Sequence, residues 1–271
     1  MRNRYSGLCS AAAVLSAVGG AVLWAFFTEP ETGFYSGPAL FLWCFYGAGL
    51  LFLTWTARRV FARPAGEAVL KDTRRTGCCC LFAAAAAGWE TIRGAAGWAG
   101  ALEEGWTLSL LCEAVLMVFG LLCAVVLLRL ALHFLRGDLR RYQNSAALAI
   151  PVLWQCMRLV QRFSEHPTAV HIPVQLLELL LRAGETVFAL SAARVCSRVR
   201  LKNAGPTAAL AGIFCGICAA ALFFPRALPL PGRGFGLSAG QAADLFYSLF
   251  ALSFALDLLK GRECAAGQKS P

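Results

Sequence analysis

The chain has 271 residues, 58% of them hydrophobic, and a formal net charge of +10 at pH 7. Its mean hydropathy of +0.62 indicates a polytopic membrane protein whose core is a helix bundle in lipid. The Lys and Arg residues are dispersed between apolar runs and form no single basic face, which argues against nucleic acid as a partner.

Eight apolar runs follow one another, each near the roughly 20 residues that a helix needs to cross a bilayer. The chain starts like a signal peptide, but no small-x-small cleavage site precedes the polar TEPET, so we expect an uncleaved first helix. The runs are 7–27, 38–56, 77–99, 106–132, 145–163, 171–195, 205–224 and 241–259. The sequence thus predicts an all-α, polytopic transmembrane bundle of about eight helices in a single integral membrane domain over 1–271.

Charge in the connections predicts the orientation. Lys and Arg gather at both termini and in alternate connections, and the positive-inside bias places these in the cytoplasm. Only the last outer connection carries cations, Arg226 and Arg233, while Trp98 and Trp106 flank the second outer turn as an interface belt would. We therefore expect a multi-pass protein of the cell membrane with both termini cytoplasmic.

Two connections are long. The inner one, 57–76, is basic and is predicted to carry a short surface helix around 65–74. Attraction to anionic lipid is a sufficient explanation for its charge, with a cytoplasmic partner as the alternative. The outer one, 225–240, is rich in Pro and Gly and is predicted to lack regular structure.

The cysteines of the chain and the glycines of the seventh run favour helix packing over disulfide or redox chemistry. The 12 cysteines of the chain lie in apolar segments, inner connections and tails, so no disulfide framework is expected. Cys215 and Cys218 form a CxxC in the middle of an apolar run, where a thiolate would be poorly solvated. Gly212 and Gly216 form a GxxxG pair, which is typical of closely packed membrane helices.

Catalytic chemistry has little support. His133 lies at an inner helix end and His166 and His171 lie around an outer turn, so no intramembrane zinc site or Cys–His or Ser–His pair is obvious. No Walker or dinucleotide-binding glycine motif occurs. We expect no enzymatic activity, no cofactor and no metal site.

A motif recurs at a spacing of 65 residues: 89–93 reads WExxR and 154–158 reads WQxxR. The acids Glu113, Glu178 and Asp244 follow one another at spacings of 65 and 66. We interpret this self-similarity as four repeated helical hairpins. The cations at the inner helix ends are weaker support, because the positive-inside bias alone would place them there.

The repeat predicts ion pairs inside the membrane. With a rise of about 1.5 Å per residue, Arg93 lies roughly 9 Å and Glu113 roughly 10 Å below the outer helix ends, so the two are expected to meet. Ionisable groups in lipid are costly and need such partners. Three pairs are predicted in this way: Arg93 with Glu113, Arg158 with Glu178, and Arg226 with Asp244.

The stretch 151–194 has more intramembrane charge than such pairs require. Glu178, Arg182 and Glu185 follow the i, i+4, i+7 spacing of one helical face, and Arg158 lies on the preceding run. Several guanidinium groups together suit a carboxylate or phosphate ligand. The candidate ligand-binding residues are Arg158, Glu178, Arg182, Glu185, Arg93, Glu113 and Gln155.

Two hypotheses from different classes follow. The first is a transporter-like or solute-binding membrane protein for a small anionic or zwitterionic solute. The second is a non-transporting sensor or assembly subunit, with a membrane protein partner, in which the charges are structural. In the first, Arg158, Arg182 and Glu178 line a cavity reached from outside; in the second, they are sealed in pairs against packed neighbours.

Overall fold

The computed structural model describes residues 4–27, 35–62, 70, 73–101, 108–137, 146–165, 173–197, 203–227 and 237–267. These residues form eight α-helices, which coincide with the eight predicted apolar runs. Several helices continue past the predicted runs because a helix can extend beyond its apolar segment into the headgroup layer. The helices are α1 (Arg4–Phe27), α2 (Ala39–Phe61), α3 (Thr73–Ala101), α4 (Leu108–Arg136), α5 (Ala149–Glu165), α6 (Pro173–Cys196), α7 (Ala204–Ala227) and α8 (Ala239–Gly267).

Five of the described helices, α1, α2, α4, α7 and α8, are long and apolar enough to cross a membrane. The chain is therefore a multi-pass membrane helical protein whose surroundings are lipid. The large apolar side chains exposed on α2, such as Trp43 and Leu51, agree with this, because lipid is as apolar as they are. The α3, α5 and α6 helices are more polar, and their crossing stays a prediction.

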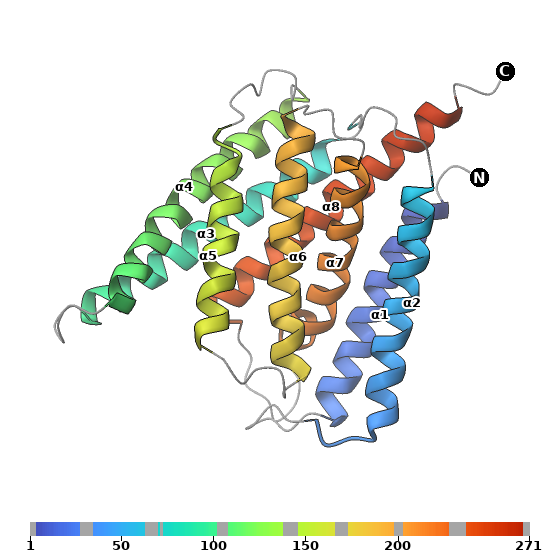
Figure 1. The fold of residues 1–271 in the computed structure, drawn as a ribbon, viewed down its shortest axis with the longest axis horizontal. Coiled ribbons are helices and arrows are strands. Elements are labelled where there is room, and N and C mark those ends of the chain that lie inside the picture. The colour runs from blue at the N-terminus through green and yellow to red at the C-terminus, as the bar shows by residue number, and fades with distance from the viewer. Residues whose placement is uncertain are drawn as a thin grey trace.

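Helices α3 to α8 form a closed ring in chain order, since each packs against the next and α3 packs against α8 (Figure 1). The α1 helix lies outside this ring against α7, with α2 beside it. The start of α1 and the end of α8 lie at the same end of the bundle (Figure 1). The six-helix ring is the frame that positions the intramembrane charges.

Aromatic rings fill the half of the ring nearer the C-terminal ends of α4 and α6. Phe134, Phe188, Tyr247, Phe250 and Phe254 are all buried and meet mostly edge to face. The Phe188 and Phe250 centroids, for example, lie 5.6 Å apart at an interplanar angle of 80°. Such pairs pack tightly and exclude water. The buried arginines lie in the other half of the ring, whereas the buried Asp257 lies beyond Phe254 and accepts a hydrogen bond from Thr76.

Small residues let α7 approach its neighbours closely. A Cβ on Gly212 would collide with the backbone oxygen of Ala251 and would lie 2.9 Å from the Ala255 Cβ. A Cβ on Gly20 of α1 would lie 2.8 Å from the Cα of Ala221. The predicted packing role of Gly212 is confirmed, because only hydrogen fits between α7 and α8 at this point.

The connections are shorter than the sequence predicted. The α2 helix runs to Phe61 and α3 begins at Thr73, so the predicted surface helix around 65–74 falls mainly outside the described residues. At the other side, Pro225 and Arg226 belong to α7, and 228–236 lies outside the described residues.

Candidate functional site

The α5 helix turns its polar face to the centre of the ring. Gln155 and Arg158 are 0% and 1% exposed, whereas Leu153, Val160 and Phe163 are exposed. This is the reverse of a soluble surface helix, and the reason is that lipid surrounds the bundle. The predicted concentration of polar residues in α5 therefore faces the interior of the ring.

Arg158 is the hub of the buried charges. Its Nη1 forms an ion pair with the Asp244 Oδ1 at 2.6 Å. Its Nε and Nη2 donate to the Glu90 Oε1 at 3.2 and 3.1 Å, and Nη2 also donates to the Gly240 carbonyl at 3.1 Å. Nη1 donates to the Gln155 Oε1 at 3.4 Å. All three nitrogens are engaged, by partners on α3, α5 and α8.

Arg182 and Glu185 of α6 complete this arrangement. Arg182 donates from Nη2 to the Asp244 Oδ2 and from Nη1 to the Arg158 carbonyl, both at 3.2 Å. Glu185 accepts a hydrogen bond from Ser248 at 2.9 Å and lies 4.0 Å from the Arg158 Nη1. We call Arg158, Arg182, Glu90, Asp244 and Glu185 the ionic cluster. It joins α3, α5, α6 and α8 across the ring.

Glu178 has other partners than predicted. It pairs with Arg162 of α5 through Oε2 and with Arg226 of α7 through Oε1, the latter at 2.8 Å. The predicted pairs Arg158–Glu178 and Arg226–Asp244 are wrong, since Arg158 pairs with Asp244 instead. Depth along a hairpin was the only basis for those pairs, and it ignores which side chains face the ring centre.

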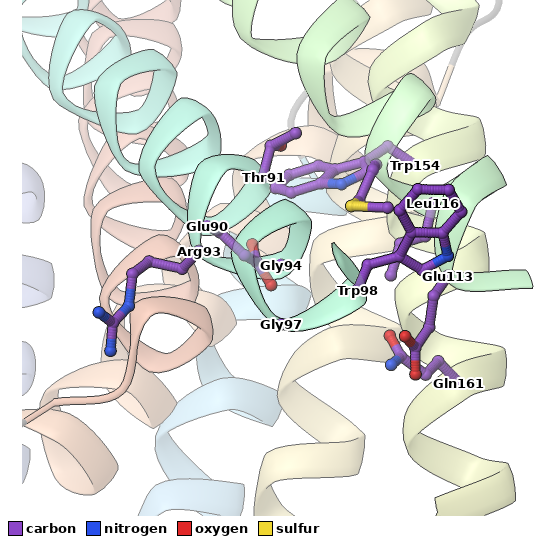
Figure 2. A pocket seen from close by; sticks show the side chains of 11 residues that line it. Glu90, Thr91, Arg93, Gly94, Gly97, Trp98, Glu113, Leu116, Trp154 and Gln161 are labelled. Atoms are coloured by element: carbon purple, nitrogen blue, oxygen red, sulfur yellow. The ribbon is translucent and has the colours of Figure 1, made fainter. Parts of the chain in front are cut away.

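The predicted Arg93–Glu113 pair is also wrong. Both side chains are exposed, and no ion pair joins them. Figure 2 shows the Arg93 guanidinium pointing away from the other labelled side chains, whereas the Glu113 carboxylate and the Gln161 amide point toward one another. The reason is helix rotation, because Arg93 lies on the outward face of α3.

The two copies of the repeated motif lie in different environments. On α3, Trp89 is 54% exposed and Arg93 is exposed. On α5, Trp154 is 2% exposed and the Arg158 guanidinium lies over its ring at 4.6 Å from the centroid. The sequence match therefore does not extend to matching contacts, and the four-hairpin repeat stays a prediction.

The ion pairs described here balance in charge. Within the described part of the chain they join four arginines, Arg158, Arg162, Arg182 and Arg226, to four carboxylates, Glu90, Glu178, Glu185 and Asp244. A balanced network of this kind supplies its own counterions. Within these ion pairs, every arginine charge is therefore matched by a carboxylate charge.

A cavity of about 340 Å³ lies between α3, α4 and α5, beside the ionic cluster (Figure 2). Glu90, which the sequence did not single out as a site residue, belongs to both; of the predicted site residues, only Arg93 and Glu113 line the cavity. The glycines of α3 leave the space, since a Cβ on Gly97 would meet nothing within 4 Å. The cavity is lined by Glu90, Thr91, Arg93, Gly94, Gly97, Trp98, Glu113, Leu116, Met117, Trp154 and Gln161.

Sequence reasoning missed this cavity as a site. The signal was present in the small residues of α3, where Gly94 and Gly97 lie beside Trp98 on the sequence GAAGWAG. It was not decisive, because small residues in a membrane helix more commonly allow another helix to pack closely. Here no side chain fills the space opposite Gly97.

Cysteine and metal chemistry gain no support from the described residues. The cysteines from Cys9 to Cys218 are free, and Cys215 and Cys218 are buried within α7. In that same part of the chain, no group of three or more His, Cys, Asp and Glu side chains is placed to hold a metal ion.

No protein-family model, no curated protein and no solved structure matches this chain, so its function has to be argued from the ionic cluster and the cavity.

Proposed function

We propose that this protein is a transporter-like, solute-binding membrane protein whose ligand occupies the cavity between α3, α4 and α5. The supporting observation is Glu90. Its Oε1 is held by Arg158 at 3.1 Å, while its Oε2 is buried and has no hydrogen-bond partner within the described structure. An unsatisfied buried carboxylate oxygen is costly. Gln155 Nε2, Arg182 Nε, Glu185 Oε2 and Asp244 Oδ1 are in the same condition, so it is the place of Glu90 in the cavity lining that favours a ligand there.

The ionic cluster has a structural role in this proposal. Arg158 is 1% exposed and every nitrogen of its guanidinium is engaged, so it forms a wall of the cavity and holds the helices around it. The predicted binding residues Gln155, Glu178, Arg182 and Glu185 share this role. The proposed binding site is the neighbouring cavity instead of these residues, and the proposal includes no catalytic step.

The second candidate is a non-transporting sensor or assembly subunit. The observation in its favour is that Arg158, Arg182 and Glu178 are held in ion pairs and do not line the cavity, which is the arrangement expected from the sequence for this candidate. In that case the cavity is a packing defect, and filling it is harmless or stabilising. The two candidates therefore differ in what happens when the cavity is filled.

Replacing Gly94 by Leu tests this difference. A Cβ at Gly94 would lie 3.7 Å from the Met117 Cγ, in ordinary contact, so the added side chain enters the cavity without forcing the helices apart. The expected result is a folded protein that no longer binds any member of a solute panel of amines, amino acids, carboxylates and phosphates, measured by titration calorimetry on the purified full chain.

Gly49→Leu is the matched control, because Gly49 lies on α2, outside the cavity, and a Cβ there meets nothing within 4 Å. It should bind as the unsubstituted protein does. If no solute binds the unsubstituted protein and Gly94→Leu only raises its thermal stability, the solute-binding proposal is wrong and the assembly-subunit candidate replaces it.

The proposed topology has eight crossings and both termini in the cytoplasm. The support is that the start of α1 and the end of α8 lie at the same end of the bundle (Figure 1), together with the alternating basic connections. Epitope tags at the two termini should stain only after cells are permeabilised. A tag inserted within 228–236 should stain in intact cells. Staining of either terminal tag in intact cells would rule this topology out.

A further inference from the structure

Resting on the proposed function, we infer that the cavity binds an organic cation: an ammonium group with a small apolar body. The sequence predicted an anionic or zwitterionic ligand, and the arrangement of charges around the cavity points the other way. Three features of the molecule support a cation: the charges of the lining, the two indoles in it, and the engagement of the arginines elsewhere.

The lining is negative where it faces inward. Two carboxylates, Glu90 and Glu113, line the cavity. Glu113 is exposed and takes part in none of the ion pairs within the described residues, and the buried Oε2 of Glu90 has no hydrogen-bond partner there. The cation in the lining, Arg93, points its guanidinium away (Figure 2). A positively charged ligand would therefore meet one carboxylate that no ion pair among the described residues neutralises, Glu113, and a second, Glu90, whose charge is already paired with Arg158.

Two indoles supply surfaces that suit such a cation. Trp98 and Trp154 both line the cavity. The Trp98 Nε1 donates to the Leu110 carbonyl at 3.0 Å, which fixes the ring in place. Trp154 already lies against one cation, the guanidinium of Arg158. Indole faces attract ammonium groups most strongly among the aromatic side chains, and aromatic sites are how proteins recognise quaternary ammonium ligands.

The size of the cavity fits a small ligand. Its volume of about 340 Å³ lies at the lower end of ligand pockets. Leu116 and Met117 add apolar surface beside the two indoles. An amine with a few carbon atoms around or beside its nitrogen would fill this space, with its charge near the carboxylates and its carbon atoms against the apolar lining.

An anion lacks equivalent partners. Arg158 and the two Nη atoms of Arg182 donate to Asp244, Glu90 and backbone carbonyls, the remaining Arg182 Nε is buried, and neither arginine lines the cavity. A carboxylate or phosphate ligand would have to displace an internal carboxylate and leave it buried without a counterion. A cation in the cavity needs no such exchange.

The same chemistry occurs in free amines and in the choline headgroup of a lipid. Glu113 and Gly97 are exposed, so the cavity opens to the surroundings of the bundle, where either source is present. The inferred ligand class is the ammonium group itself, and the experiment separates the two sources.

The test compares choline with 3,3-dimethylbutan-1-ol, its neutral isostere with carbon in place of nitrogen. Titration calorimetry is done on the full chain in maltoside detergent, with acetate and inorganic phosphate as anionic probes. Choline is expected to bind saturably and at least roughly tenfold tighter than the isostere, as a desolvated cation–aromatic contact would give.

Glu113→Gln and Trp98→Leu should each weaken choline binding. Glu113→Asp should retain most of the binding, and Trp43→Leu, on the lipid-facing surface of α2, all of it.

The source is resolved by repeating the titration in phosphatidylglycerol nanodiscs with and without phosphatidylcholine. Competition by phosphatidylcholine identifies a lipid headgroup, and binding unaffected by it identifies a free amine; both support the inference.

Equal binding of choline and its isostere, no binding of choline, or full binding by Glu113→Gln overturns the inference. If acetate or phosphate binds instead and Gly94→Leu abolishes that binding, the cation inference fails but the proposed function stands. If nothing binds and Gly94→Leu behaves as Gly49→Leu does, both fail.

Discussion

Replacing Arg158 by Met is expected to destabilise the protein by about 3–5 kcal/mol, because removing one partner of a buried ion pair leaves an uncompensated charge. In this protein the orphaned groups are Asp244, Glu90 and Glu185, from three different helices of the ring. The measurement is the thermal unfolding of the full chain in maltoside, together with the fraction of expressed protein that is monodisperse. We expect little folded protein at physiological temperature.

Two further variants keep this prediction testable even if Arg158→Met does not fold. Glu90→Gln added to Arg158→Met removes an acid whose ion pair among the described residues is with Arg158, at 3.1 Å, so the double variant should recover part of the lost stability. Arg93→Met is the control, since Arg93 is exposed and no ion pair described here includes it. Equal stability of Arg158→Met and Arg93→Met would show that the ionic cluster does not hold the ring together.

Replacing Gly212 by Leu is expected to separate α7 from α8. The new Cβ alone would collide with the backbone oxygen of Ala251 and crowd the Ala255 Cβ at 2.9 Å, and backbone cannot move aside as a flexible side chain can. Overpacking of this kind costs roughly 1–3 kcal/mol, and more where backbone is displaced. Because α1 packs against α7, the loss of the α7–α8 contact should appear as a lower unfolding temperature and as aggregation in size-exclusion chromatography.

Gly47→Leu on α2 is the matched control for Gly212→Leu, because a Cβ at Gly47 meets nothing within 4 Å. It adds the same side chain to a membrane helix without a steric conflict and should leave the unfolding temperature unchanged. An unchanged unfolding temperature for Gly212→Leu as well would mean that α7 and α8 are not held at this distance.

In the proposed function, the ionic cluster and the cavity have different roles: the first holds the helices and the second binds the ligand. The internal charges pair with one another and fix four helices of the ring. The cavity beside them is lined by Glu113, which is in no ion pair described here, and by Glu90, whose Oε2 has no hydrogen-bond partner among the described residues. Rigid supporting groups behind a site preserve its shape when a ligand enters or leaves. The proposed ligand therefore meets a preformed negative cavity whose far wall is a neutralised network.

Local residue patterns were enough to predict the helices. The eight apolar runs coincide with the eight described helices, and the inward orientation of Gln155 and Arg158 follows from their position on an otherwise apolar segment. Both results depend only on residues within one helix, through the cost of polar groups in lipid and the helical period. The role of Gly212 in packing was predictable for the same reason.

Tertiary structure decided the rest. Which arginine meets which acid depends on the rotation of each helix about its axis and on which helices face one another across the ring. Glu178 thus pairs with Arg162 and Arg226, whereas Asp244 pairs with Arg158. The cavity likewise exists because α3, α4 and α5 leave space opposite glycines, and that space is a property of three helices together. The sequence by itself determined which residues are costly in lipid; only the packing of the ring determined which of them, like Arg158, have an ion-pair partner and which, like Glu113, have none among the described residues.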